Sequence, residues 1–95
     1  MINYYATEFI PQGDAIGVIE RSTSLRDDEH THSFYNILMI TGGSGRAFVD
    51  SKGYDIKPGT VFFVDRTVPH RIEPSGEVSY TDIIITPEFF ESLEA

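Results

Sequence analysis

The chain has 95 residues, of which 15 are acidic and seven are basic, so its formal net charge is −8. Such a charge repels a polyphosphate backbone, which excludes tight DNA binding by this chain alone. Cysteine is absent, which excludes disulfides, thiolate metal sites and a cysteine nucleophile. The length predicts one domain over residues 1–95. No signal-peptide pattern or membrane-spanning run is present in the sequence, so we expect a cytoplasmic location and no membrane partner.

Short strands separated by turn residues are expected along most of the chain. Apolar, β-branched and aromatic residues mark eight candidates, at 2–9, 15–21, 32–40, 46–50, 54–56, 60–64, 70–73 and 78–85. Clusters of Gly, Pro and short polar residues mark the breaks, at 11–14, 42–45, 50–53, 58–59 and 74–76. The break at 50–53 predicts a tight hairpin. Eight short strands in so small a domain predict an all-β sandwich or closed barrel.

The last ten residues change character and predict a short helix over 86–95. Thr86 offers an N-cap hydroxyl, Pro87 suits the first helical position, and Glu88 lies where the helix dipole favours a negative charge. The apolar side chains available to one face of this helix are Phe89, Phe90 and Leu93. The helix either packs back on the barrel or leads into a longer helical region outside this sequence.

All three histidines fall into one pattern, the pair His30 and His32 followed much later by His70. Residues two apart in a strand point to the same side, so the first two imidazoles share a face, and a histidine on a neighbouring strand completes a cluster. The same alternation places Phe34 and Asn36 on this face, followed by apolar core positions. Three neutral imidazoles can hold a divalent metal with water, or bind the hydroxyls of a small polar ligand. A solvated or hydrogen-bonded histidine with neither role is the simpler alternative.

Several runs of the sequence carry a family resemblance, namely 30–36, 42–45, 54–59, 61–64 and 68–70. Together they resemble a cupin double-stranded β-helix, which is a jelly-roll barrel. More narrowly, they resemble the amino-terminal ligand-sensing domain of AraC-type transcription regulators, over about residues 16 to 90. The resemblance implies an all-β cupin barrel of about eight short strands with a short C-terminal helix. In a regulator, a helix-turn-helix region outside this sequence would follow.

One position departs from metal-binding cupins, which usually present two histidines, a carboxylate and a later histidine. The matching residues here are His30, His32, Asn36 and His70, so an amide stands in place of the carboxylate. An amide oxygen is a neutral and weaker ligand for a transition metal. The sequence therefore favours a site that requires no cofactor and contains no catalytic residue. The alternative is a divalent metal (Zn, Fe, Mn or Ni) held by the three histidines.

Three functions remain open on this reading. The first is a small-molecule-sensing and dimerisation domain of a regulator, in which a sugar or other small polar metabolite contacts His30, His32, Phe34, Asn36 and His70. Phe34 is included because its ring can stack on a ligand ring. The second is a stand-alone metal-dependent cupin enzyme of the dioxygenase or sugar isomerase type, and the third is a dimerisation module with a vestigial pocket. Exposed strand edges and the apolar terminal helix predict a homodimer.

Overall fold

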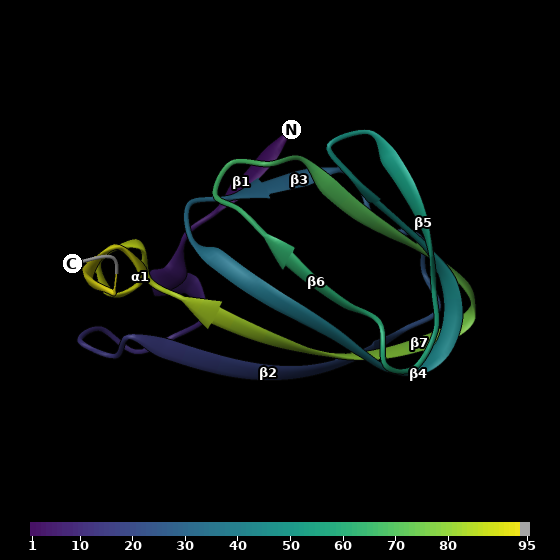
Figure 1. Ribbon diagram of the computed structural model, residues 1–95, viewed down its shortest axis with the longest axis horizontal. Coiled ribbons are helices and arrows are strands. Elements are labelled where there is room, and N and C mark those ends of the chain that lie inside the picture. The colour runs from purple at the N-terminus through teal and green to yellow at the C-terminus, as the bar shows by residue number, and fades with distance from the viewer. Residues whose placement is uncertain (94–95) are drawn as a thin grey trace.

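The computed structural model describes residues 1–93 as seven strands, a single-turn helix and a short α-helix (Figure 1). The elements are β1 (Ile2–Tyr4), the 3-10 helix η1 (Ala6–Glu8), β2 (Ile16–Thr23), β3 (His30–His32), β4 (Tyr35–Val49), β5 (Lys52–Ile56), β6 (Val61–Val64), β7 (His70–Ile85) and α1 (Pro87–Ser92). All seven strands belong to one sheet. The structure therefore confirms the prediction of a mostly-β fold with one short C-terminal helix.

The sheet curls on itself, so that strands distant in the sequence lie side by side (Figure 1). Its main path runs β1-β3-β7-β4-β5, with β2 paired to β7 and β6 paired to β4. The pair β1 and β3 is parallel, and the other pairs are antiparallel. The two long strands β4 and β7 are thus the centre of the sheet. Every other strand except β1 pairs with one of them.

The structure has seven strands where about eight were expected, and the boundaries differ because two of the expected breaks are bends inside continuous strands. β4 continues through residues 42–45 and β7 through 74–76, and the two remain paired across the bend with register shifts near Gly42. Gly43 has a φ of +78°, and a Cβ at this position would overlap the backbone carbonyl of Glu77. Glycine is therefore required here for a close approach of two strands, whereas the sequence pattern indicated a loop.

The start of the chain also differs from the prediction of a strand over residues 2–9. β1 ends at Tyr4, and η1 follows, because the Glu8 carboxylate accepts a hydrogen bond of 2.6 Å from the Tyr5 backbone N–H. The predicted strand over 32–40 is likewise divided, since β3 ends at His32 and β4 begins at Tyr35. The hairpin at 50–53 is confirmed, with β4 and β5 paired around a turn.

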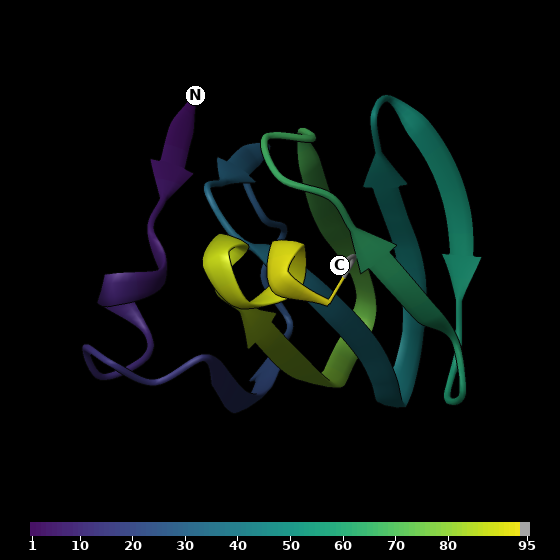
Figure 2. The ribbon, with the colours of Figure 1, turned by 60° about the vertical axis from the view of Figure 1, so that its left-hand side comes forward.

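The C-terminal helix is confirmed and packs back on the sheet (Figure 2). The Thr86 hydroxyl accepts a hydrogen bond from the Phe89 backbone N–H at 3.4 Å, and Pro87 begins the helix. The Phe90 ring stacks on Tyr35 of β4, with 4.0 Å between ring centroids, and lies 5.6 Å from the ring of Phe63 in β6. One of the three apolar side chains of the helix therefore anchors it.

Buried apolar side chains form two clusters at the two ends of the barrel. One contains Leu38, Ile40, Ala47, Ile56, Ile72 and Val78, with Phe62 and Tyr80 at its margin. The other contains Ile10, Phe34 and Ile84, with Tyr4, Ala6, Phe9 and Ile19 packed against it. Residues of both clusters, together with polar residues, line a cavity.

Candidate functional site

The structure brings the three histidines together, as the spacing predicts. His30 and His70 occupy paired positions on β3 and β7, and their ring centroids are 4.3 Å apart. His32 lies 4.4 Å from His70 and 5.1 Å from His30 by the same measure. One nitrogen atom of each ring can be chosen so that all three lie within 4.8 Å of one another.

Backbone carbonyls fix the orientation of two of these rings. The Nδ1 of His30 lies 2.8 Å from the carbonyl oxygen of Asp28, and the Nδ1 of His70 lies 2.8 Å from that of Val68. A carbonyl can only accept, so Nδ1 carries a proton in both rings, and in a neutral ring this leaves the lone pair on Nε2. Two imidazoles are thus prepared to accept a hydrogen bond or to bind a metal through Nε2.

Burial keeps two imidazoles of the cluster, His32 and His70, neutral. It lowers the pKa of His32 from 6.5 to about 3, and the nearby His70 and His30 lower it further, while the Asn36 side chain opposes the shift. Burial also lowers the pKa of His70 to about 4, although its hydrogen bond to the Val68 carbonyl raises it. At neutral pH both rings are therefore uncharged acceptors.

Phe34 and Asn36 lie on the predicted face but already have partners. Phe34 is 1% exposed, and its ring stacks on His32 with 4.3 Å between centroids. Asn36 is also 1% exposed, and its Nδ2 donates a hydrogen bond of 2.7 Å to Asp82. Two buried atoms, Asn36 Oδ1 and His32 Nδ1, have no hydrogen-bond partner among the described residues.

The carboxylates of this site were not predicted from the sequence, because the alternation that placed the other residues runs only along the strand that contains His30 and His32. Asp82 of β7 and Asp27, in the segment between β2 and β3, both line the cavity. Burial raises the pKa of each of these carboxyl groups, while Arg21 lowers both; the Asn36 hydrogen bond also lowers that of Asp82. The Arg21 Nε lies 3.8 Å from Asp82 Oδ2. The alternation along β7 could have revealed Asp82, since it shares a face with the buried Ile84.

The cavity lined by both apolar clusters has a volume of about 500 Å³. Besides the residues above, its polar lining includes Thr23, Arg26, Asp28, Glu29 and Tyr80, and its apolar lining includes Tyr4, Phe9, Leu38 and Ile72. Apolar walls with a few convergent polar groups are typical of sites for small ligands. All five residues predicted to bind a ligand line this cavity.

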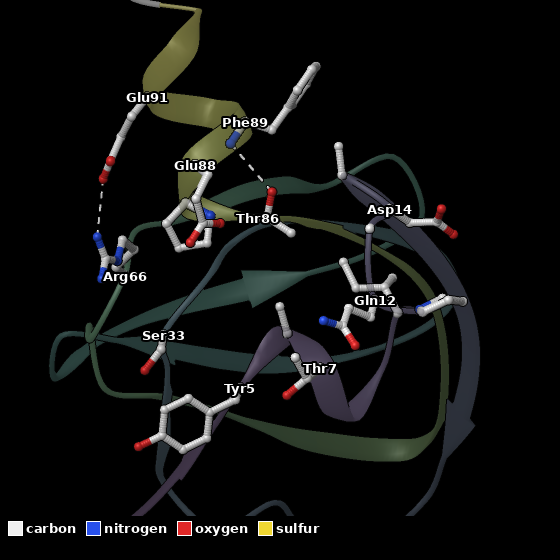
Figure 3. A pocket seen from close by; sticks show the side chains of 16 residues that line it. Tyr5, Thr7, Gln12, Asp14, Ser33, Arg66, Thr86, Glu88, Phe89 and Glu91 are labelled. Atoms are coloured by element: carbon white, nitrogen blue, oxygen red, sulfur yellow. Dashed lines mark hydrogen bonds and ion pairs between the residues drawn. The ribbon is translucent and has the colours of Figure 1, made fainter.

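A second, larger cavity of about 830 Å³ lies between η1, the following loop and α1 (Figure 3). None of the predicted site residues lines it, and its polar side chains Thr7, Gln12, Asp14 and Glu88 are exposed. Arg66 reaches into it but is paired with Glu91, at 3.1 Å. This surface groove lacks the buried, convergent polar atoms of the histidine cavity.

The fold is a β-barrel with a cavity that contains the histidine cluster, and the sequence places it in a family. Residues 13–94 match the AraC-like ligand binding domain, and the chain belongs to that family, as the resemblance predicted. It is 30% identical over 91 residues to the HTH-type transcriptional activator RhaS of Shigella sonnei and to that of Escherichia coli K12. These alignments cover 94% of this chain and 33% of each activator, so the chain spans about a third of the length of these curated relatives.

Solved structures confirm the cupin barrel. A cupin superfamily protein from Desulfitobacterium hafniense superposes with a TM-score of 0.71 at 19% identity, over 82% of this chain and 73% of that one. A cupin 2 conserved barrel domain protein from Rhodopseudomonas palustris gives 0.70 at 16% identity, over 81% and 56%. A predicted oxalate decarboxylase from Thermotoga maritima gives 0.64 at 26% identity, over 75% and 64%. Among the residues that the structure describes, no helix is long and apolar enough to cross a membrane.

Proposed function

We propose that this domain senses a small polar metabolite, such as a sugar, as the ligand-binding and dimerisation part of a cytoplasmic transcription regulator. The observation that carries the proposal is the cavity of about 500 Å³ in which three imidazoles and the half-buried carboxylates of Asp27 and Asp82 converge. Membership of the AraC-like family and the similarity to RhaS activators support it. A DNA-binding region outside residues 1–95 would then read the ligand state, because the −8 charge of this chain disfavours DNA.

Neutral hydroxyl groups match the chemistry of this cavity. The Nε2 atoms of His30 and His70 accept hydrogen bonds, as do the carboxylates, while Arg21 donates. A hydroxyl can do both, and it could also satisfy the unpartnered Oδ1 of Asn36. A polyol would thus gain several hydrogen bonds in a site that is largely preformed. In this proposal Phe34 supports His32 from behind, because its ring is stacked on that imidazole.

Regulation requires that the ligand bind two states of the protein with different affinity. In the proposed regulator one state closes the cavity around the ligand and the other leaves it open to solvent. The ligand shifts the balance between the two states by the difference in its binding free energy for them. Two buried polar atoms without a hydrogen-bond partner, Asn36 Oδ1 and His32 Nδ1, provide such a difference. The cavity thereby acts as the sensor, and the dimer would transmit its state.

A metal-dependent cupin enzyme is the second candidate, and the histidine cluster favours it. His30, His32 and His70 fit a divalent Zn, Fe, Mn or Ni ion, since their nitrogen atoms lie within 4.8 Å and two rings already expose Nε2. When bound, the ion would polarise an oxygen ligand or activate water. The Thermotoga maritima relative described as a predicted oxalate decarboxylase adds support by analogy.

Calorimetric titration separates these candidates. The wild type and His70→Ala are titrated with a panel of sugars and, separately, with Zn, Fe, Mn and Ni salts. A sensor is expected to bind one sugar class with a metal chelator present and to lose that affinity in His70→Ala. Sugar binding that needs metal, or full metal stoichiometry with submicromolar affinity and no sugar bound, would contradict the proposal and favour the enzyme. Gln12→Ala, at the second cavity, is the control and should behave as wild type.

A further inference from the structure

We infer that the ligand of the histidine cavity carries a positively charged amine, as an amino sugar does, and that the cavity discriminates against anionic metabolites. This inference rests on the proposed function, because it names the chemical class of the small polar ligand of the same site. Three features of the cavity support it. They are the sign of its charged lining, the position of Asp82 in the sheet, and the acceptor atoms that are buried at the site.

The charged side chains that line the cavity are mainly acidic. The carboxylates are those of Asp27, Asp28, Glu29 and Asp82, and the guanidinium groups are those of Arg21 and Arg26. The imidazoles of His32 and His70 add no positive charge at neutral pH, because burial lowers their pKa values to about 3 and about 4. Three of the four carboxylates are consecutive residues in the segment that joins β2 to β3. Such a lining attracts cations and repels anions.

Asp82 occupies a position of the sheet where its neighbours are apolar. It pairs with Ile19 of β2 and with Leu38 of β4, and the buried Ile84 follows on the same face of β7. A carboxylate among such neighbours loses hydration, and an apolar side chain at this position would avoid that cost. The barrel core therefore gives no reason for an acidic residue here, whereas a ligand of opposite charge does.

The negative charge of Asp82 is only partly compensated by the described residues. Its Oδ1 accepts a hydrogen bond of 2.7 Å from the Nδ2 of Asn36, which is a neutral donor. The Nε of Arg21 lies 3.8 Å from its Oδ2, which is longer than a hydrogen bond, and the Arg21 side chain is 42% exposed. Burial raises the pKa of both Asp82 and Asp27, and Arg21 lowers it in both. One exposed guanidinium is thus shared by two carboxylates, which leaves a surplus of negative charge.

The buried groups that the cavity offers to a ligand are hydrogen-bond acceptors. A carboxylate can only accept from Asn36, so the amide turns its Nδ2 to Asp82 and its Oδ1 away. Asn36 is 1% exposed and lines the cavity, and its Oδ1 has no hydrogen-bond partner among residues 1–93. The Nε2 of His70 is an acceptor too, because its Nδ1 donates to the Val68 carbonyl. A ligand with several N–H or O–H donors would satisfy these atoms.

A primary ammonium group meets these requirements better than a hydroxyl group alone. It has three N–H donors and a positive charge. The hydrogen bond between Asn36 and Asp82 holds an amide oxygen and a carboxylate side by side, so that one ammonium can donate to both. Charge-assisted hydrogen bonds of this kind are about twice as strong as those between neutral groups. The hydroxyl groups of the same ligand would donate to the Nε2 of His70, whereas a carboxylate or phosphate ligand would be repelled by Asp27 and Asp82.

Calorimetric titration at neutral pH, with a metal chelator present, compares sugars that differ in this one group. The probes are glucosamine, galactosamine and mannosamine, each with its parent hexose and its N-acetyl derivative, together with glucuronic and galacturonic acids. At least one amino sugar should bind about tenfold or more tightly than its parent hexose and its N-acetyl derivative, and the two acids should not bind. Asp82→Asn keeps the size of the side chain and an acceptor oxygen but removes the charge. It should lose about tenfold or more in affinity for the amino sugar and less than about threefold for the parent hexose.

Glu77→Gln is the matched control, because it removes one carboxylate charge at an exposed position outside the cavity and should bind like the wild type. Asp27→Asn is the second variant, with the same expected selectivity, and thermal unfolding shows whether each variant is folded. Equal losses in Asp82→Asn and Glu77→Gln would overturn the inference.

The same titrations separate failure of the inference from failure of the proposed function. A neutral hexose that binds as tightly as its amino sugar overturns the inference and leaves the proposed sugar sensor in place. Tighter binding of a hexuronic acid also overturns it, and would make Arg21 the group that holds the ligand. If none of the probes binds, the inference is wrong and so is the proposed sugar ligand.

Discussion

Acidification should destabilise the domain through its buried histidines. Burial lowers the pKa of His32 to about 3 and that of His70 to about 4, against 6.5 for an ordinary histidine. The unfolded chain therefore binds more protons than the folded one between about pH 4 and pH 6.5. The stabilisation is fully present above pH 6.5 and is lost as the pH falls below it. We expect a large fall in the free energy of unfolding between about pH 7.5 and about pH 5.

The magnitude follows from the distance between pH 5 and the ordinary pKa. For each histidine that stays neutral in the folded protein at pH 5, the free energy of unfolding falls by about 1.4 kcal/mol per pH unit below 6.5. The fall is therefore about 2 kcal/mol for each histidine and about 4 kcal/mol for the two together. The raised pKa values of Asp27 and Asp82 act in the opposite direction, because the folded protein then takes up protons before the unfolded chain does. The net loss should therefore lie below this sum, on the order of 2 to 4 kcal/mol.

Urea unfolding at the two pH values, with a chelator present, measures this loss. His70→Gln is the matched variant, and its stability should fall by about 2 kcal/mol less than that of the wild type over the same range. An equal fall in both proteins would place the pH dependence elsewhere. A wild type whose stability is constant or rises between the two pH values would refute the reasoning.

Three further outcomes are expected. Gly43→Ala should destabilise the domain by more than about 3 kcal/mol or prevent folding, whereas Gly42→Ala, whose Cβ meets only ordinary contacts, should cost under about 1 kcal/mol in a urea titration. Asn36→Asp should lower the free energy of unfolding by about 2 kcal/mol without metal, because it replaces the donor to Asp82 with a second carboxylate. Zinc should restore more stability to this variant than to the wild type. Equal stabilisation of both proteins by zinc would count against metal binding at this site. The domain alone should give no shift of DNA in a gel at physiological salt, and tight, salt-sensitive binding would contradict this.

The histidine cluster could be predicted because it depends on short-range rules. The two-residue period of a strand places His30 and His32 on one side, and a family resemblance places His70 beside them. The C-terminal helix could be predicted for a similar reason, since the capping role of Thr86 is local. The family and the barrel, both confirmed by the comparisons, could be predicted because their motifs lie within short runs of sequence.

The remaining features depend on pairings between distant residues. Asp82 belongs to the cavity because β7 lies beside β4; the alternation with Ile84 indicates its face, but not that this face meets the histidines. Asp27 lies at the cavity because its backbone N–H donates a hydrogen bond to the Ile72 carbonyl of β7, and this contact has no local signal. The bends at 42–45 and 74–76 contain residues typical of turns, and only the pairing of β4 with β7 shows that the strands continue. Local propensity thus indicated where the chain curves but could not show whether it remains paired.

The pairing of β2 has a consequence for the way in which the chain folds during synthesis. β2 pairs with β7, so that Ile16 lies opposite Ile85, and no other described strand pairs with it. The hairpins of β4 with β5 and β6 can form early, but β2 must wait as an unpaired segment until β7 leaves the ribosome. Closing a loop of this length is slow, and an unpaired strand is prone to aggregation meanwhile. β2 is therefore the strand that stays unpaired longest during synthesis and is most open to misassembly in that time.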